Sequence, residues 1–88
     1  MNALLNAVCV VYNLSLDEIS SGRRLASEAR SMSAWITLET TGCTIAQLAA
    51  ATGRAPSSLS SAAKRIEAWA RKKSRVRDQS DKILQLIA

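Results

Sequence analysis

Apolar residues recur every three or four positions along most of the chain, a spacing that places them on one face of an α-helix. The pattern predicts helices over residues 2–13, 16–20, 25–40, 45–52, 56–73 and 78–87. Residues 74–77 interrupt it and are interpreted as a hinge before the last helix. The prediction is therefore a single compact all-α domain of five to six helices over residues 1–88.

Capping residues indicate where several of these helices begin or end. Ser15 is followed three residues later by Glu18, and Thr44 by Gln47, so each pair is typical of a capping box at a helix N-terminus. Gly42 can adopt the left-handed conformation that ends many helices, and the helix over residues 25–40 is expected to stop at residues 40–42.

Residues 44–73 have the spacing of a helix-turn-helix. The two helices are expected to cross at a small residue, Ala49, and the chain to turn four residues later at Gly53, which tolerates positive φ. Leu59, six residues further on, is expected to pack back into the core, and Pro56 suits the first turn of the second helix. The alternative is an ordinary corner between two helices with no role in DNA binding.

Charge is unevenly distributed along the chain. The net charge is +5, and between residues 54 and 77 eight basic residues are opposed by one acidic residue, Glu67. Such a block is typical of proteins that bind polyanions, although a solvated helix face gives the same pattern. Together with the helix-turn-helix spacing, it favours double-stranded DNA as the partner.

In a helix-turn-helix the second helix enters the major groove, and its N-terminal residues reach the base edges. The contacts predicted for this motif are Arg54, Ser57, Ser58, Ser60, Ser61 and Lys64. Arg54 is long enough to reach a base or a phosphate, whereas Lys64 and Arg65 are expected on phosphates. The serine hydroxyls discriminate weakly between bases, and the alternative for them is simple solvent exposure.

A second basic region lies at SSGRR, residues 20–24, which is predicted to be a loop. Arg23 and Arg24 belong to this loop, and Arg30 lies inside the helix that follows. If the loop packs beside the second helix of the motif, these arginines would contact phosphates or the adjacent minor groove. The alternative is a solvated basic turn.

The order of these elements resembles the C-terminal DNA-binding domain of the bacterial replication initiator DnaA. The resemblance covers nearly the whole chain and lies in AVCVVYNLSLDEI, SSGRR, EARSMSAWITLE, TIAQLAAATG and AAKRIE. It implies a Trp-repressor-like all-α fold in which a basic loop and a recognition helix together read a short box of duplex DNA. By position, the implied DNA contacts are Arg23, Arg24, Arg30, Arg54, Ser57 and Ser58.

The chain departs from that family where the recognition helix begins. The family has Gly-Arg-Asp-His-Thr-Thr, whereas residues 53–58 read Gly-Arg-Ala-Pro-Ser-Ser, so that Ala55 and Pro56 replace two base-reading residues. This variant is more similar to the DnaA-like domain at the C-terminus of bacterial HUH tyrosine transposases associated with palindromic repeats. The resemblance implies a monomeric, cytoplasmic and nucleoid-associated module that recognises a different DNA sequence and accompanies a catalytic transposase domain in a longer parent.

Enzymatic activity is not expected from these residues. The chain has no His, no CxxC pair and no Gly-rich phosphate loop, so neither a metal site nor a cofactor is predicted. The single tyrosine, Tyr12, falls on an apolar helical face, which argues against a covalent tyrosine mechanism. Trp35 is interpreted as a core residue, and Trp69 as packing between the last two helices.

The alternative to DNA binding is a small helical protein-interaction module whose basic face contacts an acidic partner. A membrane location is not expected, because no apolar stretch approaches the length of a membrane span and no signal peptide is visible.

Overall fold

In the computed structural model, which describes residues 2–40 and 43–87, the chain forms five α-helices and one short 3-10 turn. They are α1 (Asn2–Tyr12), the 3-10 turn η1 (Glu18–Ser20), α2 (Arg24–Glu39), α3 (Ile45–Thr52), α4 (Pro56–Lys72) and α5 (Ser74–Ile87). These described residues contain no strand, so the all-α prediction is confirmed. None of the helices has the length and apolar character needed to cross a membrane.

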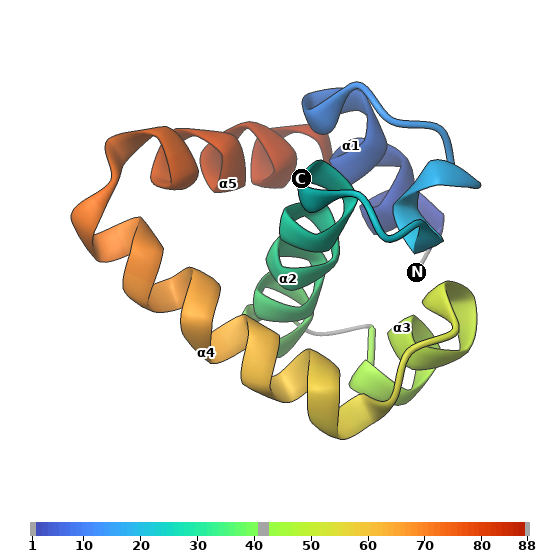
Figure 1. Cartoon of the computed structure of the whole chain (residues 1–88). Helices are drawn as coiled ribbons and strands as arrows, with labels where there is room; N and C mark the ends of the chain where they lie inside the picture. The colour runs from blue at the N-terminus through green and yellow to red at the C-terminus, as the bar shows by residue number, and fades with distance from the viewer. Residues whose placement is uncertain (1, 41–42, 88) are drawn as a thin grey trace.

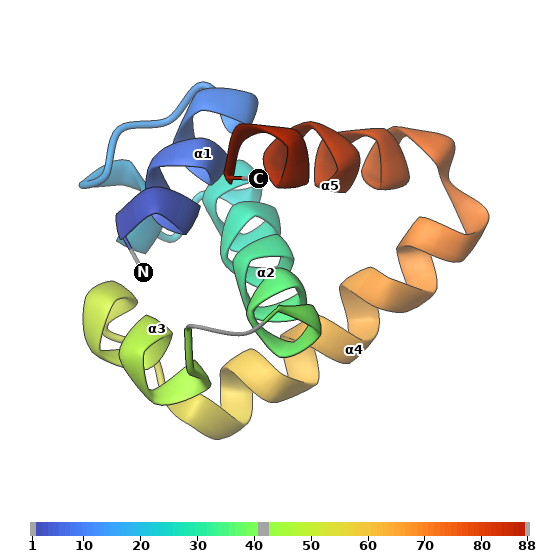
Figure 2. The ribbon, with the colours of Figure 1, turned by 180° about the vertical axis from the view of Figure 1, so that it is seen from behind.

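Helix α2 runs through the middle of the fold and contacts α1, α3 and α4, most extensively α4 (Figure 1). Helix α5 packs against α1 and the end of α4. Helix α3 lies at the opposite end of α2 from the α1–α5 pair, as the view from behind also shows (Figure 2). The α3–α4 corner is therefore held on the fold by the central helix.

The core receives side chains from all five helices. Its largest fully buried apolar residues on these helices are Val8, Met32, Leu48, Ile66, Val76 and Ile83. Helix α2 presents small residues to its neighbours, and Ala26, Ala29 and Ser33 are completely buried. The Ser33 hydroxyl donates to the carbonyl oxygen of Ala29 at 2.8 Å, so its burial leaves no polar atom unsatisfied. Small residues on the central helix allow the surrounding helices to approach closely.

The reciprocal hydrogen bonds expected of both predicted capping boxes are present, and the box at Thr44 begins an α-helix as predicted. The backbone N–H of Ser15 donates to Glu18 Oε1 at 3.0 Å, and the N–H of Glu18 donates to Ser15 Oγ at 3.1 Å. The same reciprocal pair joins Thr44 and Gln47 at 3.0 and 3.1 Å. Ser15 does not cap an α-helix, however: the predicted helix over residues 16–20 is only the 3-10 turn Glu18–Ser20, whose N-cap residue is Asp17.

The predicted hinge at residues 74–77 is also wrong. Helix α5 already begins at Ser74, and the bend is confined to Lys73, whose backbone is extended (φ −122°, ψ 112°). Val76 is completely buried, so packing against the core holds this polar stretch in a helix. The predicted helix end at residues 40–42 is described only at Thr40, which is extended, because Thr41 and Gly42 lie outside the described residues.

The two tryptophans differ from each other. Trp35 is half-buried and packs against the core, as predicted. Trp69 is 47% exposed, so the prediction that it packs between the last two helices is wrong. The neighbouring Ala70 is buried instead, because adjacent residues on an α-helix point about 100° apart. Trp69 is consequently available to a partner on the surface.

Candidate nucleic-acid interface

The corner between α3 and α4 has the local geometry that the sequence predicts. Gly53 adopts the left-handed conformation (φ 68°, ψ 25°), and its N–H donates to the Ala49 carbonyl oxygen at 2.9 Å. Ala49 and Leu59 are both buried. Pro56 occupies the first turn of α4, where its missing N–H breaks no helical hydrogen bond. An ordinary helix corner shares these features, so a helix-turn-helix role for residues 44–73 stays a prediction.

The predicted serine contacts lie on the N-terminal half of α4. Ser57, Ser58 and Ser61 are exposed and line a shallow depression together with Arg65, whereas Ser60 is half-buried. Lys64 is also exposed. The structure therefore brings three of the four serines to one surface with a basic side chain beside them.

A contact between Arg54 and the loop before α2 joins the two predicted basic regions. The Nη2 of Arg54 donates to the Ser20 carbonyl oxygen at 3.1 Å, across 34 residues of sequence. The SSGRR loop thus lies against the turn at the start of α4, as the sequence interpretation required for a shared surface. Arg54 remains exposed, so part of its guanidinium is still accessible to a partner.

Arg30 has a role other than the predicted DNA contact. Its side chain is buried, and Nη1 donates to the carbonyl oxygens of Ile19 and Ser21, both at 2.7 Å. Burial, and secondarily the nearby positive charge of Arg54, lower the pKa of Arg30 from its usual value. A guanidinium committed to two carbonyls in the interior positions the loop, so Arg30 is removed from the set of proposed contacts.

Arg23 and Arg24 are both exposed, but only Arg23 lies in the predicted loop, because α2 already begins at Arg24. Arg23 forms an ion pair with Glu18 at 3.7 Å, and both side chains are largely solvent-accessible. Such an exposed pair contributes little to stability, so Arg23 can exchange Glu18 for a phosphate. Two hydrogen bonds with Ser15, and then Arg23, hold the pKa of Glu18 below its usual value. Arg24 lies at the start of α2, where it lines a larger cleft.

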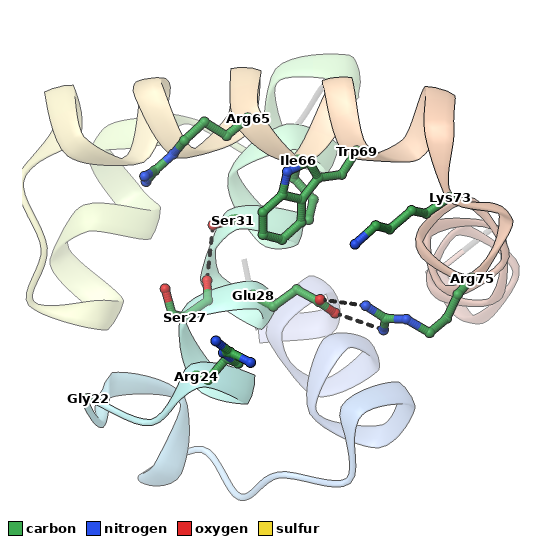
Figure 3. Close-up of a pocket in the computed structure, with 10 residues that line it drawn as sticks. All are labelled: Gly22, Arg24, Ser27, Glu28, Ser31, Arg65, Ile66, Trp69, Lys73 and Arg75. Atoms are coloured by element: carbon green, nitrogen blue, oxygen red, sulfur yellow. Dashed lines mark hydrogen bonds and ion pairs between the residues drawn. The ribbon is translucent and has the colours of Figure 1, made fainter.

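This cleft, of about 640 Å³, lies between the N-terminal part of α2 and the C-terminal half of α4 (Figure 3). Its cationic side chains are Arg24, Arg65, Lys73 and Arg75. Arg75 donates to both carboxylate oxygens of Glu28, at 2.9 and 3.3 Å, and these bonds are drawn in Figure 3. The cleft therefore carries three cations in addition to a neutralised ion pair.

Glu28 stays ionised in this cleft. Its burial acts to raise its pKa, but the Arg75 guanidinium and the nearby Tyr12 hydroxyl outweigh that effect and bring the pKa below the usual value. The Tyr12 hydroxyl is buried near Glu28 and makes no well-formed hydrogen bond within the described residues. Burial and the adjacent carboxylate raise the pKa of Tyr12, so its phenol stays protonated.

The basic residues between positions 54 and 77 divide into those with a partner in the structure and those without an ion-pair partner. Arg71 pairs with Glu67 at 3.3 Å, Arg75 pairs with Glu28, and Arg77 donates to the Ala70 carbonyl oxygen at 3.2 Å. Five other basic residues have no ion-pair partner within residues 2–40 and 43–87: Arg54, Lys64, Arg65, Lys72 and Lys73. The available charge is therefore mostly on α4 and its N-terminal turn.

Sequence reasoning missed the cleft and the exposed indole of Trp69. A signal was present in the spacing, because Ser57, Ser61, Arg65, Trp69 and Lys73 follow one another at intervals of four residues. Residues four apart are neighbours on a helix surface, so this row forms a ridge that winds by about 40° per step around α4 and ends at Lys73, just after the helix. Arg65 lines both the serine depression and the cleft, and so joins them into one surface.

Comparisons with protein-family models, with curated proteins and with solved structures find no match to this chain. The resemblance to the DnaA C-terminal domain stays a prediction from the segments quoted above. The residues described contain no group of three or more side chains that could hold a metal ion.

Proposed function

We propose that this protein binds double-stranded DNA, with the N-terminal half of α4 in the major groove and the loop before α2 on the adjacent backbone. The observation that carries the proposal is the hydrogen bond between Arg54 and the Ser20 carbonyl oxygen. It places the basic loop and the exposed end of α4 side by side, so one duplex can contact both. A helix corner with no role in DNA binding would not be expected to have the basic SSGRR loop beside it.

The proposed contacts are of two kinds: those with phosphates, which position the protein on DNA, and those with base edges, which recognise the sequence. Arg23, Arg24, Arg54, Lys64 and Arg65 are exposed cations that neutralise phosphates. The hydroxyls of Ser57, Ser58 and Ser61 contact base edges, and Ser60, which is half-buried, contributes less. Because a hydroxyl both donates and accepts, it distinguishes bases less sharply than Arg or Asn does. The affinity for DNA should therefore depend strongly on the contacts with its phosphates.

The resemblance supports a finer proposal. The chain acts as a DnaA-like, sequence-specific binding module of a bacterial cytoplasmic, nucleoid-associated protein, as a monomer and without chemistry of its own. In a longer parent it would deliver a catalytic transposase domain to its DNA. Ala55 and Pro56 offer no side-chain hydrogen bond to a base, so the DNA sequence recognised differs from the DnaA box.

The first experiment is selection of bound duplexes from a random pool. A recovered sequence motif supports specific recognition, and uniform recovery contradicts it. Salt dependence then counts the phosphate contacts, since each neutralised phosphate contributes about −0.9 to the slope of log K against log salt concentration. Five phosphate contacts correspond to a slope of about −4.5.

Arg54→Ala combined with Lys64→Ala tests the groove model. We expect affinity to be lost at moderate salt and the remaining slope to fall to about −2.7, because two phosphate contacts are gone. The matched control is Lys72→Ala with Lys82→Ala, which removes the same charge from exposed positions outside both depressions. Far-ultraviolet circular dichroism checks that each variant is folded. Equal losses in the two double variants would point to a basic face without a defined site, as in the protein-interaction alternative.

A further inference from the structure

We propose that the cleft between α2 and the C-terminal half of α4 binds an unpaired nucleotide of a DNA strand, with its base stacked on Trp69 and its phosphate held by Arg24 and Arg65. This inference rests on the proposed function and extends it from duplex DNA to a nucleotide next to the duplex.

The stacking surface is the indole of Trp69. Its side chain is 47% exposed and enters the cleft from α4 (Figure 3). The ammonium of Lys73 lies over the ring, 5.5 Å from its centroid. Lys73 is exposed and its side chain is flexible, so a base can replace the ammonium on the ring. The displaced ammonium then stays close enough to interact with the nucleotide's phosphate.

Charge complementarity selects an anionic ligand. Arg24 and Arg65 enter the cleft from its two walls, one on α2 and one on α4. The one carboxylate in the lining, Glu28, is held by two hydrogen bonds from Arg75 and does not oppose a phosphate with a free negative charge. An aromatic face with guanidinium groups beside it matches a base with its phosphate.

The position of the cleft favours an unpaired nucleotide over a paired one. Trp69 follows Ser61 by two intervals of the four-residue row, or about 12 Å along α4 at about 1.5 Å per residue. The major groove of B-DNA is about 12 Å wide. Eight residues also rotate the side-chain direction by about 80°, so when Ser61 faces base edges the indole of Trp69 points away from those bases. A base in the duplex cannot reach the indole there, whereas a nucleotide at a strand end can.

Fluorescence anisotropy of labelled DNA tests the inference. The duplex recovered by selection is compared, blunt and with a short single-stranded extension at either end and on either strand. We expect one extension to increase affinity roughly tenfold, and Trp69→Ala to remove that gain while the affinity for the blunt duplex stays unchanged. Trp69→Phe should retain most of the gain, because a phenyl ring also stacks. Leu86→Ala is the matched control, since it removes another exposed apolar side chain.

The outcomes separate the two proposals. If no duplex binds, the proposed function is wrong and this inference falls with it. If blunt and extended duplexes bind equally, or if Trp69→Ala weakens both equally, the duplex site stands and the nucleotide site is wrong. Deoxyadenosine monophosphate is titrated alone while tryptophan fluorescence is followed in the Trp35→Phe background. If deoxyadenosine monophosphate quenches the fluorescence of Trp69 but a single-stranded extension does not increase duplex affinity, the cleft binds a free nucleotide and not a nucleotide of a DNA strand.

Discussion

Arg30→Met tests whether the loop before α2 is held in place from inside the fold. Methionine retains an apolar side chain of similar length but removes the guanidinium that donates to the carbonyl oxygens of Ile19 and Ser21. Both carbonyls then lose a buried partner, and the loop that ends at Arg23 loses its side-chain connection to α2. The variant should therefore be less stable, although Arg30 contributes little to the surface.

The size of the effect follows from the two hydrogen bonds. A hydrogen bond from a charged donor contributes about 1.5–3 kcal/mol, which gives about 3–6 kcal/mol for the pair. Removing the cation also removes its desolvation cost, so we expect the free energy of unfolding to fall by about 2–3 kcal/mol. For a domain of this length, each 1 kcal/mol lowers Tm by about 4–8 °C, and Tm should fall by roughly 8–24 °C.

Urea denaturation followed by circular dichroism measures the change directly. The control is Arg23→Met in the same loop, where the ion pair with Glu18 is exposed and its loss should leave the stability nearly unchanged. DNA affinity should also fall in Arg30→Met, because the loop that carries Arg23 is no longer positioned. A loss of stability below about 1 kcal/mol, or one equal to that of Arg23→Met, would refute the positioning role of Arg30.

Two further predictions concern the turn and the cleft. Gly53→Ala should lower the free energy of unfolding by about 1–2 kcal/mol, because Gly53 has φ 68° and an added Cβ there meets strain without a clash. Gly22→Ala is the control in urea denaturation, since an added Cβ meets nothing within 4 Å and its φ is not positive, and equal losses would contradict the argument. Because the pKa of Glu28 is below its usual value when folded, its ion pair with Arg75 adds stability above about pH 4.5 that is lost as the pH falls through the folded-state pKa. In Glu28→Gln the free energy of unfolding should fall less steeply as the pH is lowered below about 4.5. If it falls equally steeply in both proteins, the Glu28–Arg75 ion pair is not the source of this pH dependence.

Much of the α3–α4 corner was predictable because it depends on contacts within a few residues. The Thr44–Gln47 capping box, the left-handed Gly53 and the first-turn Pro56 are each determined by the chemistry of one short segment. The hinge prediction at residues 74–77 failed for the converse reason. Their polarity argued for a break, but burial of Val76 against the other helices holds them in α5.

The role of each cationic residue, in contrast, was not readable from its position. Arg23 and Arg30 both look like surface cations in the sequence, yet one is exposed and the other is buried with two carbonyl partners. The sequence predicts Trp69 between the last two helices, whereas the face that α4 actually buries passes through its neighbour Ala70. A helix turns by about 100° per residue, so an error of one residue in the buried face changes which side chain is available to a partner.

The sequence by itself determined the all-α class, the capping boxes and the turn at Gly53, since these follow from hydrophobic spacing and from bonds between residues at most four apart. Only the tertiary structure decided which basic residues share a surface. The bonds from Arg30 to Ile19, from Arg54 to Ser20 and from Arg75 to Glu28 span 11, 34 and 47 residues. Such pairs form only when packed helices bring distant segments together, and no local pattern encodes that packing.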